Sequence, residues 1–199
     1  LIFLLNSCTT YMSEENFKEV TAVENPVTPQ EKSASKKRMN AAKHLNHWTI
    51  HGAIAANSQH KSWTASINWK QTTLNNYKLH LFGPLGGGSV IVEKKGNIIT
   101  YQDGPKRLRT TNIDEIFYKE TGVRVPLHNL YYWVRGVKAP GGVQASKKDS
   151  AGHYKSLTQG GYTVRYIGYQ NVKGIDLPTK LDVRGPGGRL KLVIKNWQV

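Results

Sequence analysis

The chain has 199 residues, of which 38% are hydrophobic and 10% aromatic, and its 28 basic and 13 acidic side chains give a formal net charge of +15. This length suits one domain with a sizeable core, and the hydrophobic fraction excludes a disordered chain. The charge predicts attraction to a polyanion, although charge alone does not distinguish nucleic acid, anionic lipid and an acidic protein.

The first residues carry a signal of their own. Leu1–Ser7 is an apolar stretch, too short to span a bilayer, that ends directly before the single cysteine, Cys8. One cysteine cannot form an internal disulfide. Leu5 and Ser7 precede Cys8 at the positions of a bacterial lipobox, in which the cysteine thiol takes a lipid. We therefore expect residues 1–7 to be a truncated signal peptide and Cys8 to be the lipid anchor; a chance apolar start is the alternative.

The next segments differ in composition. Residues 8–29 mix Ser, Thr, Asn, Glu and Pro without periodicity, which predicts a flexible, lipidated tether. From Gln30 to Asn46, apolar residues recur at helical spacing and predict an amphipathic helix. We find no evidence for a second domain, so residues 30–199 are expected to form one domain.

After this helix the period of the apolar residues changes from about 3.6 to 2, which is typical of strands. Residues 48–56 and 63–70 alternate in this way and are joined near Asn57-Ser58-Gln59-His60, which predicts a hairpin with one apolar face. Further strands are expected at residues 77–82, 89–94, 97–102, 154–159, 162–169, 180–184 and 189–197. The short connections between them predict an antiparallel sheet.

Two short helices are predicted in the middle of the chain. Asn112 with Glu115 three residues later is a capping signal, and the helix that it opens is expected to stop at Gly122. A second helix is expected to start at Pro126 and to end at Gly136.

Catalysis is not indicated. The seven histidines do not form a metal-binding spacing with a carboxylate, and signatures of Ser or Cys nucleophiles are missing. Gly86-Gly87-Gly88 lacks the Lys-Ser/Thr of a phosphate loop. We therefore expect no catalytic residues, no metal and no cofactor, and we do not expect an enzyme.

Nucleic-acid binding is a second possibility. The strand Tyr162-Thr163-Val164-Arg165-Tyr166 places aromatic beside basic side chains and could stack single-stranded bases. The export signal argues against this partner, because periplasmic proteins rarely meet nucleic acid. The same aromatic residues are also expected in an ordinary core.

The apolar faces of the predicted strands suggest a third interpretation. A sheet of about nine strands with one apolar face, under a few short helices, can curl over that face and leave a cavity that the helices cover. The fold class is then a β-rich α+β protein, an incomplete, half-closed antiparallel barrel with a lid of short helices over a hydrophobic cavity suited to an acyl chain. The residues expected to line it share the apolar face of consecutive strands: Trp48, Ile50, Ile54, Trp63, Ile67, Trp69, Leu79, Leu81, Val164 and Tyr166.

Several short motifs of this chain resemble those of a known protein family. They are Trp69-Lys70-Gln71, Gly83-Pro84-Leu85-Gly86, the run from Thr121 to Gly136, Gln159-Gly160-Gly161-Tyr162 with Tyr166 and Tyr169, Leu177-Pro178, and Arg189-Leu190-Lys191-Leu192 with Trp197. With these motifs in order after a lipobox, residues 40–199 resemble the outer-membrane lipoprotein receptors of the LolB family. The resemblance implies an incomplete antiparallel barrel closed by a helical lid. The soluble relative LolA shares that fold without a lipid anchor, so Cys8 favours the receptor.

The resemblance also implies a function and partners. A receptor of this kind accepts lipoproteins by their acyl chains from a LolA-like periplasmic carrier and inserts them into the inner leaflet of the outer membrane. The expected partners are that carrier, the acylated cargo and outer-membrane phospholipid. Nucleic acid is not a partner, and the protein is expected to be a monomer on the periplasmic face of the outer membrane, anchored through Cys8.

The family has a protruding loop with an exposed apolar residue at its tip. Pro84, Leu85 and Gly86 match that loop, and Leu85 is expected to enter the lipid, whereas the alternative is a leucine folded back into the core. Two other functions stay open for the whole chain. One is a lipoprotein that binds a free fatty acid or sterol for storage or sensing, and the other is an envelope scaffold with a filled core.

Overall fold

A computed structural model describes residues 28–83, 88–124 and 126–199. A large sheet holds strands β1 (Trp48–Ser58), β2 (Ser62–Thr73), β3 (Asn76–Phe82), β4 (Ser89–Lys95), β5 (Ile98–Asp103), β6 (Lys106–Thr110), β7 (Ala145–Lys148), β8 (Tyr154–Gln159), β9 (Tyr162–Tyr166), β12 (Lys180–Gly185) and β13 (Gly188–Gln198). A hairpin of β10 (Tyr169–Val172) and β11 (Ile175–Pro178) stands apart from it. The helices are α1 (Pro29–His44), α2 (Ile113–Thr121) and α3 (Leu127–Trp133).

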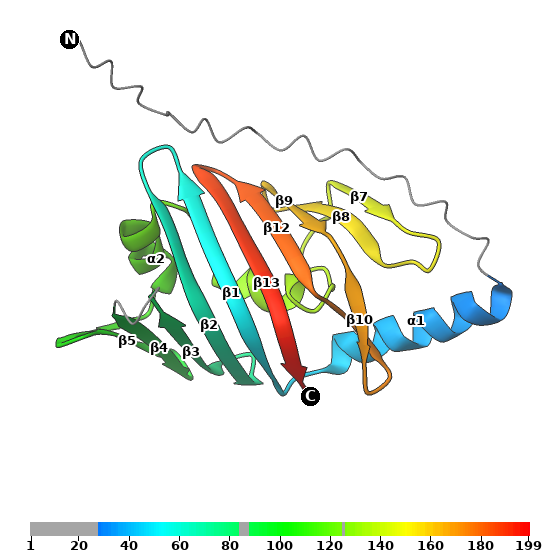
Figure 1. Cartoon of the computed structure of the whole chain (residues 1–199), viewed down its shortest axis with the longest axis horizontal. Helices are drawn as coiled ribbons and strands as arrows, with labels where there is room; N and C mark the ends of the chain where they lie inside the picture. Colours follow the sequence, from blue (N-terminus) through cyan, green and yellow to red (C-terminus); the bar gives the residue numbers. More distant parts are fainter. Residues whose placement is uncertain (1–27, 84–87, 125) are drawn as a thin grey trace, which may run out of the picture.

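The large sheet has eleven strands in the order β6-β5-β4-β3-β2-β1-β13-β12-β9-β8-β7. Every pairing in it is antiparallel, and the first strand, β1, lies beside the last, β13. The chain passes from the edge strand β6 to the edge strand β7 through α2 and α3, which lie on one face of the sheet (Figure 1). We call this the inner face. The predicted β-rich α+β fold, an antiparallel barrel left open, is confirmed.

The structure contains strands that the sequence did not predict. The edge strands β6 and β7 lack alternating burial, because nearly all of their side chains are exposed. Both carry basic residues, which protect a sheet edge against pairing with another chain. The prediction of one strand over residues 162–169 is wrong. β9 ends at Tyr166, and Tyr169 begins a separate strand, β10, which pairs with β11.

The helix ends follow local capping chemistry. Thr28 and Glu31 form a capping box at the start of α1, with Pro29 in the first turn. Asn112 occupies the N-cap of α2 as expected, but its side chain makes no capping hydrogen bond. Gly122 ends α2 in the left-handed conformation and donates its N–H to the Tyr118 carbonyl oxygen at 2.8 Å. The helix expected to reach Gly136 ends at Trp133, so α3 is shorter than predicted.

An aromatic cluster fills the inner face where β1, β2 and β13 meet. The Trp48 ring centroid lies 4.9 Å from that of Trp69 and 5.5 Å from that of Trp197. Trp69 donates its indole N–H to the Gln71 side-chain oxygen at 2.7 Å, and Trp197 donates to the Pro178 carbonyl at 2.9 Å. The cluster is therefore fixed by directed hydrogen bonds as well as by burial.

A buried arginine joins α3 to the end of α1. Arg135 exposes 1% of its surface, and its Nη1 donates to the carbonyl oxygens of Ala42, Lys43 and Leu45 at 3.1, 3.4 and 2.7 Å. These carbonyls lie at the C-terminus of α1, where a positive charge is favourable. The guanidinium also lies over the Tyr131 ring, with Cζ 4.1 Å from its centroid. Burial lowers the pKa of Arg135, while the neighbouring tyrosines oppose this effect.

We expect Arg135→Met to lower the free energy of unfolding by about 2–4 kcal/mol, because buried carbonyls at the end of α1 lose their donor. Urea unfolding followed by tryptophan fluorescence measures the change. Arg165→Met, at an exposed position of β9, is the matched control and should stay within about 0.5 kcal/mol of the wild type. Equal stability of the two variants would contradict the role of Arg135.

A second polar contact holds the other part of α1. The Arg38 Nε donates to both Asp176 carboxylate oxygens, at 2.9 and 2.8 Å, and His153 Nε2 lies 3.0 Å from Asp176 Oδ2. Asn171 donates to Asp176 Oδ1 at 2.9 Å. Burial alone would raise the pKa of Asp176, but the hydrogen bonds from Asn171, Arg38 and His153 outweigh it and hold that pKa below its ordinary value of 3.8.

A carboxyl group with a depressed pKa stabilises the fold above its ordinary pKa and loses this contribution as the pH falls through the folded-state value. Asp176→Asn should therefore cost about 2–4 kcal/mol near neutral pH, and this difference from the wild type should shrink as the pH falls below 3.8 and vanish once the pH lies below the depressed folded-state pKa. Urea unfolding over a pH series measures it. Glu93→Gln, which changes an exposed pair with Lys95, should cost less than about 0.5 kcal/mol; a pH-independent cost of Asp176→Asn would refute the ionic contribution.

Candidate functional site

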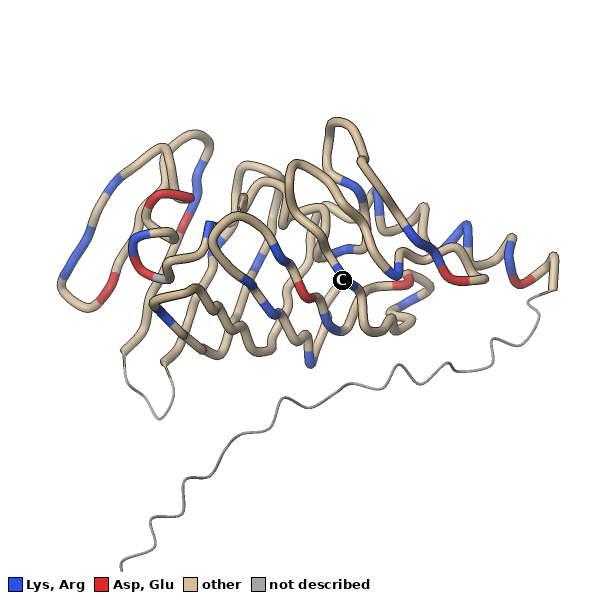
Figure 2. Tube along the Cα trace, turned by 90° about the horizontal axis from the view of Figure 1, so that it is seen from above, with Lys and Arg blue, Asp and Glu red and all other residues tan. Residues whose placement is uncertain are grey.

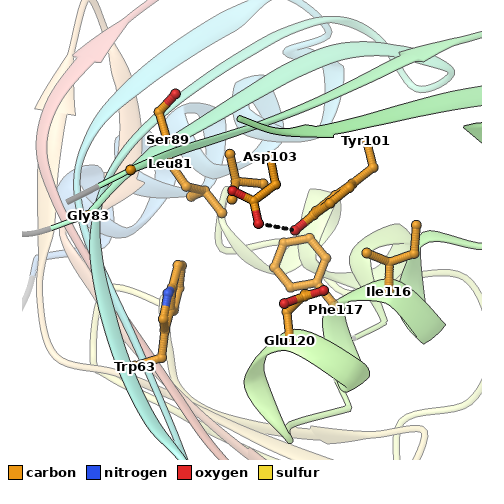
Figure 3. A pocket seen from close by; sticks show the side chains of 11 residues that line it. Trp63, Leu81, Gly83, Ser89, Tyr101, Asp103, Ile116, Phe117 and Glu120 are labelled. Carbon is orange, nitrogen blue, oxygen red and sulfur yellow. Dashed lines mark hydrogen bonds between the residues drawn. The ribbon is translucent and has the colours of Figure 1, made fainter. Parts of the chain in front are cut away.

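A hollow on the inner face lies between strands β2 to β5 and helix α2. It is a cavity of about 230 Å³, and Figure 3 shows the side chains that surround it. Its lining is mainly apolar: Trp63, Leu81, Gly83, Gly88, Ser89, Val90, Tyr101, Asp103, Ile116, Phe117 and Glu120. We call this the first cavity. Ile116 and Phe117 point into it from α2, opposite Trp63 and Leu81 from the sheet (Figure 3).

Two further cavities lie beneath the helices. One of about 10 Å³ is walled only by apolar side chains: Ile54, Ile67, Trp69, Leu79, Phe117, Leu127, Leu130, Leu190 and Leu192. The other, of about 150 Å³, opens at the N-terminal end of α2 and is more polar, with Gln71, Tyr77, Lys94, Asp114 and His128 among its lining residues. We call these the middle and the polar cavity.

The three cavities share walls. Phe117 lines both the first and the middle cavity. Trp69 and Leu127 line both the middle and the polar cavity. The space under α2 is therefore a path of three adjacent hollows separated by a few side chains, which is mainly apolar in its first and middle parts and more polar at the N-terminal end of the helix.

The charged groups lie at the two ends of this path. At the first cavity, Glu120 approaches Lys106 Nζ to 3.5 Å, and the Tyr101 hydroxyl donates to Asp103 at 3.5 Å. At the polar cavity, Asp114 accepts the Leu127 backbone N–H at 3.2 Å and so ties α2 to α3. Burial raises the pKa of Asp114, against the opposing effects of this N–H and of His128. The middle of the path has no charged lining residue.

The residues predicted to line a cavity fall into two groups. Trp63 and Leu81 line the first cavity, Ile54, Ile67 and Leu79 line the middle one, and Trp69 lines the middle and polar ones. Trp48, Ile50, Val164 and Tyr166 are buried on the same face, but they do not line any of these three cavities. Sequence reasoning did not assign the helical walls, Ile116, Phe117, Leu127 and Leu130. Their helical spacing was the available signal, because it marks the face that packs on the sheet.

The predicted anchor and insertion loop cannot be placed. Cys8, Pro84, Leu85 and Gly86 lie outside the described residues. The flanks of the loop are described: the Gly83 backbone N–H donates to the Gly88 carbonyl at 2.9 Å, and both glycines line the first cavity. The β3–β4 connection thus leaves and rejoins the fold at the opening of the first cavity.

Among residues 28–83, 88–124 and 126–199, no group of three His, Cys, Asp or Glu side chains is arranged to hold a metal ion. Within the described part of the chain, the helices are too short or too polar to cross a bilayer.

Comparisons with known proteins match this chain to one protein family. The family model for the outer membrane lipoprotein LolB matches residues 46–197. An outer-membrane lipoprotein LolB of Coxiella burnetii is 32% identical over 155 residues, which cover 77% of this chain and 73% of that protein. The Nitrosococcus oceani protein of the same name is 33% identical over 165 residues, 81% of each chain, and that of Pseudomonas putida is 28% identical over all 199 residues and 92% of its own length.

Solved structures show a similar fold. A LolA superfamily protein from Nitrosomonas europaea has a TM-score of 0.52 at 11% sequence identity, covering 85% of this chain and 93% of that one. A DUF1329 family protein from Desulfovibrio piger has a TM-score of 0.51 at 8% identity, covering 87% of this chain and 93% of that one. These identities are too low to carry more than the fold.

Phe117→Ala tests whether the path can become continuous. The change should lower the free energy of unfolding by about 2–4 kcal/mol and should tighten the binding of a fluorescent fatty acid such as cis-parinaric acid, because the first and middle cavities would join. Titration of the probe by fluorescence measures the binding. Leu157→Ala, at a buried position that lines none of the three cavities, should cost similar stability and leave the affinity unchanged. Equal affinities in both variants would show that Phe117 does not divide the path.

Proposed function

The chain belongs to the LolB family of outer-membrane lipoproteins, and we propose that it takes acylated lipoproteins from a LolA-like periplasmic carrier and releases them into the inner leaflet of the outer membrane. The observation that supports this most is the interrupted apolar path between the sheet and α2. It is lined by hydrocarbon in its middle and opens beside the β3–β4 connection. No covalent step is part of this proposal, so the protein acts as a receptor rather than as an enzyme.

Acyl chains need such a receptor for a simple reason. Moving hydrocarbon from an apolar site to water costs roughly 0.8 kcal/mol per CH₂ group, so a lipoprotein with three acyl chains faces a barrier on the order of tens of kcal/mol. Spontaneous transfer through water is therefore negligible. A protein that offers an apolar surface at both the pick-up and the release step removes this barrier.

The cavities have to widen before cargo can enter. The first cavity, at about 230 Å³, is smaller than the roughly 300–1,000 Å³ of a typical ligand site. Phe117 and Leu127 occupy the narrow points of the path and belong to α2 and α3. We therefore propose that α2 moves as a lid when acyl chains bind, together with the Leu127 end of α3, to which the contact between Asp114 and the Leu127 N–H joins it.

Attachment to the membrane completes the proposal. A lipid on Cys8, followed by the tether that ends at Thr28, would hold the domain on the periplasmic face of the outer membrane. The Gly83-Pro84-Leu85-Gly86 segment would then bring an apolar side chain, Leu85, to the bilayer beside the opening of the first cavity. Cargo leaving that opening would meet lipid directly.

We expect Leu85→Glu to block insertion of a lipoprotein into liposomes while acyl binding remains within about twofold of the wild type, since a charge disfavours entry into hydrocarbon and the cavity is untouched. The assay follows transfer of cargo from a loaded LolA-like carrier to the receptor, and from the receptor to liposomes. Ile167→Glu, at an exposed apolar position in the described part of the chain, is the control and should insert cargo normally. A wild-type chain that binds fatty acid but never strips the carrier would instead be a storage or sensing protein.

A further inference from the structure

Three basic residues surround an exposed aromatic ring at the C-terminal end of α2. We call Lys61, Tyr118, Lys119 and Arg124 the mouth patch. The three cations are exposed, and Tyr118 is 41% exposed. Lys61 belongs to the β1–β2 turn, and the other three belong to α2 and the segment that follows it. Figure 1 shows that turn and α2 at the same end of the molecule, away from α1.

Specific contacts hold the mouth patch together. Lys61 Nζ donates to the Lys119 carbonyl at 2.8 Å, in the last turn of α2, where a cation is favourable. The Arg124 guanidinium carbon lies 4.1 Å from the Tyr118 ring centroid. Gly122 packs against the β1–β2 turn, since a Cβ added there would lie 3.6 Å from the Lys61 Cβ. The patch is thus a fixed group on the surface.

The mouth patch adjoins the opening of the first cavity. Ile116, Phe117 and Glu120, on the same helix, line that cavity together with Gly83 and Gly88 (Figure 3). The carboxylate at this lip, Glu120, has Lys106 Nζ at 3.5 Å, which offsets its charge. Cationic and aromatic side chains of α2 and of the segment that follows it therefore lie beside the opening.

We propose that the mouth patch binds anionic phospholipid headgroups and turns the opening of the first cavity toward the bilayer. Lys and Arg side chains make charge-assisted hydrogen bonds to phosphate, and a tyrosine with an apolar ring and a polar hydroxyl suits the level of the headgroups. The exposed Tyr118 ring favours a lipid surface over a purely acidic protein surface. This inference rests on the proposed function, because it concerns the step at which cargo leaves.

The charge pattern of the whole chain makes a local test necessary. Lys and Arg are spread along the full length of the molecule (Figure 2), so a basic protein of this kind would be attracted to anionic vesicles to some extent through any face. The proposal is that the mouth patch contributes much more than an equal number of basic residues elsewhere.

The experiment uses the full chain with Cys8→Ser, so that no acyl group anchors it, and phosphatidylethanolamine vesicles with and without phosphatidylglycerol. We expect K61Q/K119Q/R124Q to weaken co-sedimentation with the phosphatidylglycerol vesicles about a hundredfold, at roughly fivefold per residue, and K119Q/R124Q to weaken it about 25-fold. Binding should also fall as salt is added. Thermal unfolding verifies that the variants are folded.

The matched control is K36Q/K37Q/K147Q, which removes the same charge from exposed positions on α1 and on the far edge strand β7. It should change binding less than about fivefold. Equal losses in both triple variants would mean diffuse attraction and would overturn the proposal. So would a mouth-patch variant that binds vesicles normally but no longer takes cargo from the carrier, because the patch would then dock a protein. Transfer of cargo to vesicles without phosphatidylglycerol tests the receptor function separately.

Discussion

The burial of Arg135 is the interaction on which the arrangement of the layers depends. Its guanidinium lies at the C-terminal end of α1 and over the Tyr131 ring of α3. It donates to the carbonyl of Leu45, three residues before β1 begins. A protein that keeps hollows on its inner face cannot obtain its stability by packing that face solidly, because each unfilled volume costs stability. Directed hydrogen bonds at one end of the domain replace part of that packing. Arg135 and Asp176 both lie at the α1 end, away from the first cavity.

The end of the domain near α1 and the end near α2 are therefore held by different kinds of contact. Around α3 and the end of α1, buried polar groups fix the backbone: Arg135 donates to the Leu45 carbonyl, and Gln159 accepts from the Trp133 indole at 3.2 Å and from the Ala139 N–H at 2.9 Å. At the other end, α2 meets the sheet mainly through Ile113, Ile116 and Phe117, around the cavities. Apolar contacts have no preferred direction, so α2 can move against the sheet at the cost of its exposed contacts with Lys61 and Lys106, while Asp114 keeps its hydrogen bond to the Leu127 N–H. The proposed lid movement therefore requires only the less constrained end to change.

Sequence reasoning recovered what depends on local patterns and missed what depends on tertiary contacts. Alternation along β1 and β2 predicted two strands, a hairpin and the buried face correctly, since burial with a period of 2 is visible in sequence. The exposed strand Lys106–Thr110 has no such alternation, and its place is set by pairing with β5. The same limit applies to the site. Trp48 and Ile54 share a face, but only the positions of α2 and α3 decide that Ile54 borders a hollow and that Trp48 packs against other rings.

The motifs that carried the resemblance have mostly structural roles in this fold. Gln71, Arg135 and Gln159 are buried donors or acceptors that fix aromatic rings and backbone. Such groups tolerate few replacements, because a buried partner would be left unpaired. A cavity wall such as Leu79 needs only volume and apolarity, which several residue types provide. The sequence therefore identifies the frame more clearly than the binding surface.

The side chains that interrupt the path also affect the direction in which cargo is transferred. Transfer without an input of energy requires that cargo move from a weaker to a stronger apolar environment at each step. If acyl chains enter by displacing Phe117 and Leu127, the free energy of displacing them is subtracted from the affinity of the receptor for its cargo. A bilayer requires no such displacement. On this proposal, the partial filling of the empty cavity by side chains of α2 and α3 lowers the affinity of the receptor for an acyl chain, which favours release into the membrane.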